Sequence, residues 1–256
     1  MARQRLDLLL VQRGLCETRA KAQARILAGD VLVGDRPVTK AGTAIPEDAD
    51  LRLRGADPPF VSRGGIKLAA ALDRFRLDPA GWTCFDAGAS TGGFTDCLLQ
   101  RGAAKVYAVD VGTNQLHWKL RSDPRVVSME QCNLRTWDPA RVAEPCRLLV
   151  ADLSFISLRL ALPPVFPNLQ AGADAVVLVK PQFEAGRDDV GEGGIVRDPA
   201  VHTRVLRELW GFFAATDFRP QGWMESPIRG GEGNKEFLMR LAKGREAAAL
   251  ELEPEG

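Results

Sequence analysis

The chain has 256 residues, 45% of them hydrophobic, and a formal net charge of +1. This length and apolar content suffice for one large domain and a small one, and the near neutrality requires any nucleic-acid surface to be local. The longest apolar runs, such as AVVLV at 175–179, fall far short of the roughly 18 residues of a membrane-spanning helix, so no span is expected. Five cysteines without a CxxC pair indicate neither a disulfide framework nor a metal site, and without a signal-peptide pattern a cytoplasmic location is expected.

The sequence pattern of residues 1–55 predicts a small α+β domain. Apolar spacing predicts a helix over 6–15, and a second helix over 19–28 follows Thr18, a suitable N-cap residue. Short strands are predicted at 31–33 and 51–53, followed by a Pro/Gly-containing linker over 56–64.

This region is also locally basic, with six Arg or Lys side chains against three carboxylates in its first 30 residues. Such an excess alone is weak evidence, because charged helix faces are usually just solvated. The Arg5-x-Asp7 start, the Thr18-Arg19 pair and the VxV-G hairpin resemble the small RNA-binding domain shared by a ribosomal protein, many pseudouridine synthases and tyrosyl-tRNA synthetases. The resemblance implies that a basic helix face meets RNA phosphates, through Arg3, Arg5, Arg19, Lys21 and Arg25. Such contacts provide affinity and register but little sequence information.

Residues 65–245 alternate between strand-like and helix-like segments. Buried strands are predicted at 83–88, 105–111, 126–130, 148–156 and 175–181, helices at 66–75, 94–101 and 199–215, and late strands near 222–228 and 234–242. This alternation predicts an α/β domain with a doubly wound, Rossmann-like sheet, mostly parallel with an antiparallel last strand, whose ligand lies at the carboxyl ends of the strands. The last residues, 246–256, are expected to form a frayed acidic tail.

The segment CFDAGASTGGFTD at 84–96 places a glycine-rich loop between the first of these strands and a helix. It lacks the GxGxxG of dinucleotide loops and the Lys-Ser/Thr pair of phosphate loops, which argues against both ligands and against a nicotinamide oxidoreductase. Its DxGxxxGG spacing matches S-adenosylmethionine enzymes, in which an acid can face the methionine ammonium and a second acid can accept the ribose hydroxyls. The expected cofactor-binding residues are Asp86, Gly88, Ser90, Thr91, Gly92, Gly93, Phe94, Asp110 and Asp152.

The segment ADLSFIS after the fourth strand indicates what kind of atom would accept the methyl group. It differs from the Asn/Asp-Pro-Pro-aromatic run used for exocyclic amines, and Cys146 precedes the strand, at the wrong edge of the sheet for a carbon-directed nucleophile. The polar residues expected at the strand ends are Lys67, Asp152, Lys180 and Glu236, and no metal is expected. Two lysines and two carboxylates in one pocket could position a hydroxyl and help to remove its proton.

These four positions resemble the Lys-Asp-Lys-Glu tetrad of FtsJ-type 2'-O-methyltransferases. A wider resemblance covers nearly the whole chain, since SRGGIKL, DAGASTGGFTD, DVGTNQL, ADLSFISL, VKPQFEAGR and GNKEFL occur in the order typical of the TlyA (haemolysin A) family. The resemblance implies S-adenosylmethionine-dependent methylation of cytidine ribose in ribosomal RNA, with Lys180 as general base, Asp152 and Glu236 orienting it, and Lys67 nearby. The acidic insertion RDDVGEGG at 187–194 departs from the family pattern.

Two other functions remain open from the sequence. The family name suggests a membrane-active haemolysin, although no apolar span or strongly amphipathic basic helix is evident. A non-catalytic RNA-binding or ribosome assembly factor would keep the fold without needing the glycine loop and the four polar positions. The expected partners are ribosomal RNA or ribosomal subunits, and a monomer is favoured.

Overall fold

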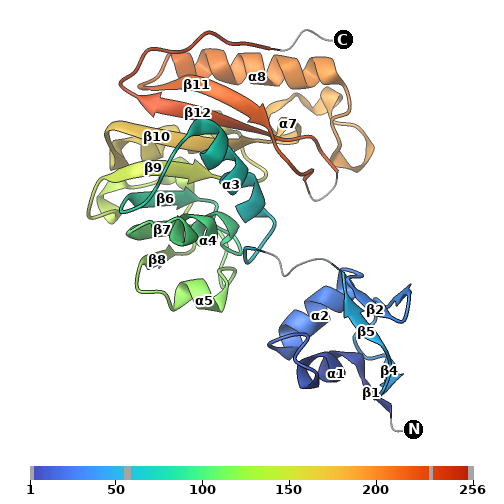
Figure 1. The fold of residues 1–256 in the computed structure, drawn as a ribbon. Coiled ribbons are helices and arrows are strands. Elements are labelled where there is room, and N and C mark those ends of the chain that lie inside the picture. The colour runs from blue at the N-terminus through green and yellow to red at the C-terminus, as the bar shows by residue number, and fades with distance from the viewer. Residues whose placement is uncertain (1–2, 55–58, 231–232, 253–256) are drawn as a thin grey trace. The chain divides into compact units, whose positions relative to one another are not determined.

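The computed structural model describes residues 3–54, 59–230 and 233–252, and the chain divides into two compact units, Met1–Pro58 and Pro59–Gly256 (Figure 1). The elements of the first unit are β1 (Arg3–Arg5), α1 (Leu6–Gln12), α2 (Arg19–Leu27), β2 (Val31–Val33), β3 (Arg36–Pro37), β4 (Ala44–Pro46) and β5 (Leu51–Leu53). β1 pairs with β4, and β2 lies between β3 and β5. The prediction missed β1, β3 and β4 because their residues, RQR, RP and AIP, lack the apolar β-branched or leucine pattern that identified β2 and β5.

The two helices of this unit close over a small apolar core. Leu6, Leu10 and Ile26 are fully buried in it, and Val31 of β2 packs beside them. The hydroxyl of Thr18 accepts a hydrogen bond from the backbone N–H of Lys21 at 3.2 Å, so it caps α2 as predicted.

The second unit is an α/β domain built on one seven-stranded sheet. Its elements are α3 (Gly64–Phe75), β6 (Thr83–Ala87), α4 (Gly93–Gln100), β7 (Lys105–Val109), α5 (Trp118–Arg121), β8 (Val126–Met129), β9 (Cys146–Ala151), α6 (Leu158–Ala161), β10 (Leu169–Val179), α7 (Pro181–Glu184), α8 (Pro199–Ala214), β11 (Phe218–Glu225) and β12 (Phe237–Lys243), joined in places by 3₁₀ turns. The strand order is β11-β12-β10-β9-β6-β7-β8, and β12 runs antiparallel to both of its neighbours (Figure 1). The predicted mostly parallel sheet with an antiparallel last strand is confirmed.

Alternating side chains of the central strands bury both faces of this sheet. Val176 and Leu178 of β10 pack into the core under α3 and α4, whereas Val177 and Val179 pack into the core under α8. β10 begins at Leu169, six residues before the predicted start, because an irregular pairing between Leu169 and Asp174 interrupts its apolar pattern.

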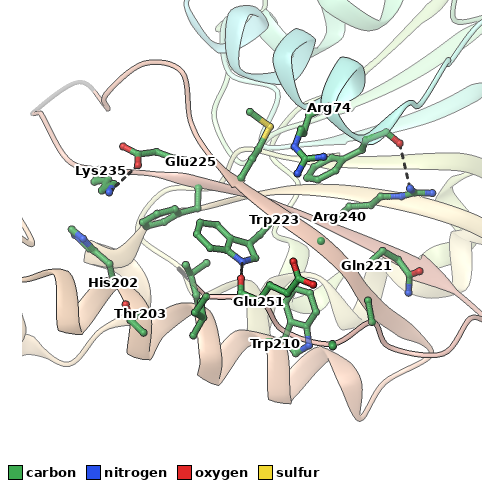
Figure 2. Close-up of a pocket in the computed structure, with 18 of the residues that line it drawn as sticks. Arg74, His202, Thr203, Trp210, Gln221, Trp223, Glu225, Lys235, Arg240 and Glu251 are labelled. Carbon is green, nitrogen blue, oxygen red and sulfur yellow. Dashed lines mark hydrogen bonds and ion pairs between the residues drawn. The ribbon is translucent and has the colours of Figure 1, made fainter. Parts of the chain in front are cut away.

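The expectation of a frayed tail is wrong for residues 246–252. The backbone N–H of Ala248 donates to Pro220 O at 2.9 Å, and Trp223 Nε1 donates to Glu251 O at 2.8 Å. This segment forms one wall of a groove of about 940 Å³ beside the edge strand β11 (Figure 2). Trp223 packs edge-on against Phe237 with ring centroids 5.7 Å apart, so the tail supports the start of β12, where Glu236 lies.

No helix within the described ranges combines the length and apolarity needed to cross a membrane.

Candidate active site

The structure brings the four predicted polar residues to strand and helix ends of the second unit. Asp152 follows β9 directly and Lys180 follows β10, while Glu236 immediately precedes the antiparallel β12. Val179 at the end of β10 pairs with Phe237 at the start of β12, so these ends share one edge of the sheet. Lys67 reaches the same edge from the first turns of α3.

Lys180 is held by two acceptors from the segment after β9. Its Nζ lies 2.7 Å from Asp152 Oδ1 and donates to Ser154 Oγ at 2.9 Å. The lysine side chain is 12% exposed and that of Asp152 25%, so the pair is mostly shielded but open on one side. A substrate hydroxyl could therefore approach an amine whose position is already set.

Lys67 and Glu236 form a second, more deeply buried pair. Lys67 Nζ donates to Glu236 Oε2 at 2.5 Å, and the side chains are only 8% and 3% exposed. Across the described residues, no hydrogen bond or ion pair connects this pair to Lys180. The expectation that Glu236 orients Lys180 is therefore not supported, because its carboxylate is engaged by Lys67.

The glycines of the loop after β6 are required by close packing within the protein. A Cβ at Gly88 would lie 2.6 Å from Asp152 O, and one at Gly93 would lie 2.2 Å from Ser62 Oγ. Gly88 and Gly92 also have φ of +81° and +96°, a left-handed backbone conformation that residues with a Cβ rarely adopt. The loop is thus pressed against the end of β9, which carries the Lys180 partner Asp152.

Asp110 is fixed by the backbone of two loops. Its Oδ2 accepts from Ser90 N at 2.8 Å and its Oδ1 accepts from Gly112 N at 2.7 Å, so each oxygen retains acceptor capacity for another donor. A small cavity beside it is lined by Ser90, Gly112, Gln115 and other residues. These two oxygens could accept hydrogen bonds from the two vicinal hydroxyls of a ribose.

Phe94 and Thr91 were both expected to touch the cofactor, but they differ in solvent exposure. Phe94 is 3% exposed and packs in the core under α3 and α4, so its ring is a core side chain, and Thr91 is exposed.

Asp86 has no exposed surface, and its Oδ2 accepts from Thr95 Oγ1 at 2.6 Å. Its Oδ1 is buried without a hydrogen-bond partner among the described residues, so the fold leaves one acceptor of this carboxyl group unsatisfied.

Burial raises the pKa of Asp86 from 3.8 to about 7, partly offset by its bond to Thr95. As pH rises, the unfolded chain therefore releases this proton at a lower pH than the folded chain does. The second unit should become less stable as pH rises from about 4 to 7. Asp86→Asn cannot ionise, so we expect it to raise the free energy of unfolding above pH 7 by roughly 3–4 kcal/mol and to flatten this pH dependence. Urea unfolding at pH 5 and pH 8 tests this, and an unchanged pH dependence would contradict it.

Phe155 is a residue that the sequence reasoning missed. It is 90% exposed, has φ of +64°, and its ring lies 5.0 Å from that of Phe183, which in turn lies 5.9 Å from Lys180 Nζ. A left-handed backbone is costly for an aromatic residue. An apolar ring held in that conformation at the mouth of the site is the signal that points to substrate contact.

The predicted RNA-binding residues of the first unit separate into exposed and buried ones. Arg3, Arg5, Arg19 and Lys21 are exposed. Arg25 is 7% exposed, donates to Arg54 O at 2.9 Å and lies 3.7 Å from Asp30. The structure does not support a phosphate contact by Arg25, because its guanidinium instead ties α2 to the end of β5.

Cys146 begins β9 at the opposite edge of the sheet and is fully buried, with its pKa raised to about 12 by burial. It is therefore the structural cysteine that the sequence indicated. The described part of the chain contains no group of three or more His, Cys, Asp or Glu arranged to hold a metal ion.

Comparison with known proteins identifies both units. Residues 60–243 match the model of the FtsJ-like methyltransferases, and residues 4–51 match the S4 domain. YqxC of Bacillus subtilis, named as a candidate rRNA methyltransferase, is 50% identical over 240 residues, covering 93% of this chain and 85% of its own length. The 16S/23S rRNA (cytidine-2'-O)-methyltransferase TlyA of Mycobacterium tuberculosis is 44% identical over 240 residues, covering 93% of this chain and 90% of its own.

A solved structure from Streptococcus thermophilus, described as a candidate hemolysin, is 46% identical with a TM-score of 0.76 and covers 96% of this chain and 90% of its own. Fold and site together define an S-adenosylmethionine-dependent methyltransferase joined to an S4 domain. Within that class, the chain belongs to the TlyA (haemolysin A) family of FtsJ-like methyltransferases.

Proposed function

We propose that this protein methylates the 2'-hydroxyl of cytidine riboses in ribosomal RNA. The observation that carries the proposal is the Lys180–Asp152 pair, at 2.7 Å, on the same sheet edge as the Asp110 loop. This arrangement would place a base next to an incoming hydroxyl group, beside the site expected to bind the ribose of the methyl donor. The M. tuberculosis relative is named for this reaction on 16S and 23S rRNA, and its similarity extends over both units.

The methyl donor and the protein's own residues would contribute different parts of the methyl-transfer reaction. S-adenosylmethionine, when bound, supplies an electrophilic methyl group, for which Asp110, Ser90 and the glycine loop form the binding surface. Lys180 orients the 2'-hydroxyl and, once it has released a proton to solvent, can accept the proton that the hydroxyl loses. Asp152 and Ser154 then stabilise the resulting ammonium through the contacts already present. The Lys67–Glu236 ion pair is a second, buried pair of opposite charges at this edge of the sheet.

The substrate is proposed to be ribosomal RNA, free or within a ribosomal subunit. The exposed Arg3, Arg5, Arg19 and Lys21 of the S4 domain supply local positive charge on a chain whose net charge is only +1. Such contacts hold RNA without reading its sequence, so the choice of nucleotide belongs to the methyltransferase unit. We propose that the protein acts in the cytoplasm as a monomer.

Phe155 is predicted to stack on a base at the mouth of the site. Base–aromatic stacking contributes about 1–3 kcal/mol, so Phe155→Ala should lower RNA methylation by about tenfold or more, while S-adenosylmethionine binding is unchanged. Phe155→Tyr should restore most of the activity. Leu160→Ala removes another exposed apolar side chain, 56% exposed, and serves as a control. Equal activity of Phe155→Ala and wild type would remove this role.

The proposal is tested by mapping ribose methylation in ribosomal RNA by mass spectrometry, with and without the gene. Loss of a cytidine 2'-O-methyl group in the deletion strain, restored by wild type and not by Lys180→Ala, is expected. Restoration by both proteins would favour a non-catalytic assembly role. Leakage of dye from liposomes upon addition of purified protein, with no change in methylation, would favour a haemolysin.

A further inference from the structure

A carboxylate is completely buried beneath the basic face of the S4 domain. Asp7, in the first turn of α1, has 0% side-chain exposure. It accepts from Arg5 Nε and Nη2 at 3.0 Å each, from Arg19 Nε at 2.9 Å, from Gln23 Nε2 at 2.9 Å and from Leu8 N at 3.1 Å. One acidic group therefore fixes two of the exposed arginines, which come from either side of it in the sequence.

Both arginines keep donors for a further partner. Arg19 engages Asp7 through Nε alone, and Arg5 through Nε and one N–H of Nη2, so most of the five N–H groups of each guanidinium remain for another acceptor. The side chains are 48% and 52% exposed. The Arg5 bonds, which are the largest influence, hold the pKa of Asp7 well below its usual range, so it stays ionised at neutral pH.

We propose that Asp7 is a positioning residue that holds Arg5 and Arg19 as a two-arginine clamp for RNA phosphate groups. This inference rests on the proposed RNA substrate. A free arginine side chain loses considerable rotamer freedom when it binds a phosphate, whereas a guanidinium already held at Nε loses less. Fixing two guanidinium groups side by side also sets the register of the RNA backbone.

Net charge and positioning predict opposite effects of removing Asp7. Asp7→Asn raises the net charge by one, so a surface that acted only through its charge would bind RNA more tightly. Loss of the clamp would instead weaken binding and remove phosphate contacts. The sign of the change therefore distinguishes the two explanations.

The experiment measures binding of the full-length protein to transcribed ribosomal RNA over a range of KCl concentrations. For Asp7→Asn we expect affinity to fall about tenfold and the slope of log K against log [KCl] to decrease in magnitude by about one to two. Asp35→Asn is the matched control, because it removes a 95% exposed carboxylate from Arg52 and changes the net charge equally. Binding by Asp7→Asn that is as tight as wild type or tighter, with a slope that does not decrease, would overturn the proposal.

Arg19→Lys covers the case in which Asp7→Asn does not fold. In this variant Asp7 keeps its bonds to Arg5, Gln23 and Leu8, and the charge is conserved. We expect a three- to tenfold loss of affinity and a slope smaller by about one, with no change in Arg52→Lys, whose arginine is 53% exposed. Wild-type binding by Arg19→Lys overturns the clamp. Failure of the wild type itself to bind any ribosomal RNA would instead contradict the proposed function.

Discussion

Lys180→Ala is expected to lower the rate of methyl transfer by about 10²- to 10⁴-fold, the usual contribution of a positioned general base. The cause is direct, since Lys180 Nζ is the amine that Asp152 and Ser154 hold at 2.7 Å and 2.9 Å on the open side of the site. S-adenosylmethionine affinity should change little, because the Asp110 carboxylate is fixed by Ser90 and Gly112 and not by Lys180. Transfer of a labelled methyl group and calorimetric cofactor binding measure the two effects separately.

Lys105→Ala is the matched control for this variant. Lys105 also forms an ion pair, with Glu144, but it lies at the start of β7, at the opposite edge of the sheet. Its removal should leave turnover near that of the wild type. If Lys180→Ala turned over as fast as Lys105→Ala and the wild type, Lys180 would have no catalytic role and the proposed mechanism would be wrong.

Breaking the Lys67–Glu236 pair is expected to reduce both stability and activity. The two side chains are 8% and 3% exposed, so Glu236→Leu leaves a buried ammonium and Lys67→Met leaves a buried carboxylate. Removing one partner of such a pair typically costs about 3–5 kcal/mol of unfolding free energy. Urea unfolding of each single variant measures this loss.

The double variant Lys67→Met with Glu236→Leu separates a structural role from a catalytic one. It leaves no unpaired charge, so most of the lost stability should return. If the pair also acts on the substrate, methyl transfer should remain at least about tenfold below wild type in this stable protein. Recovery of both stability and turnover would show that the pair is only an ion pair within the fold.

Chain order was sufficient to predict which edge of the sheet carries the site. Asp110, Asp152 and Lys180 each follow a buried parallel strand, and such strand ends must meet at one edge. Helix spacing and the Thr18 cap were sufficient to predict the two helices of the first unit, whereas its domain family was indicated by a resemblance of motifs. The elements that were missed have weak local signals, namely the short strands β1, β3 and β4, the four-residue helices α5, α6 and α7, and the early start of β10.

The predictions that failed depended on contacts between distant residues. Nothing local to Glu236 indicates that it pairs with Lys67, 169 positions away, instead of Lys180. Likewise Arg25 belongs to a basic helix in the sequence, yet its side chain turns inward to Arg54 and Asp30. The docking of residues 246–252 on β11 also depends on a partner that an acidic, low-complexity segment does not reveal.

The sequence by itself determined the class of fold and indicated the methyl donor, because strand ends and glycine spacing are local properties of the chain. Polar residues at the strand ends, together with a resemblance to the FtsJ-type tetrad, named the candidate residues of the two pairs. The tertiary structure alone decided how these residues are partnered. Strand register and helix packing join Lys180 to Asp152, Lys67 to Glu236, and Asp7 to Arg5 and Arg19. They also show that the loop glycines are required by neighbouring protein atoms, since a Cβ at Gly88 would collide with the backbone of Asp152.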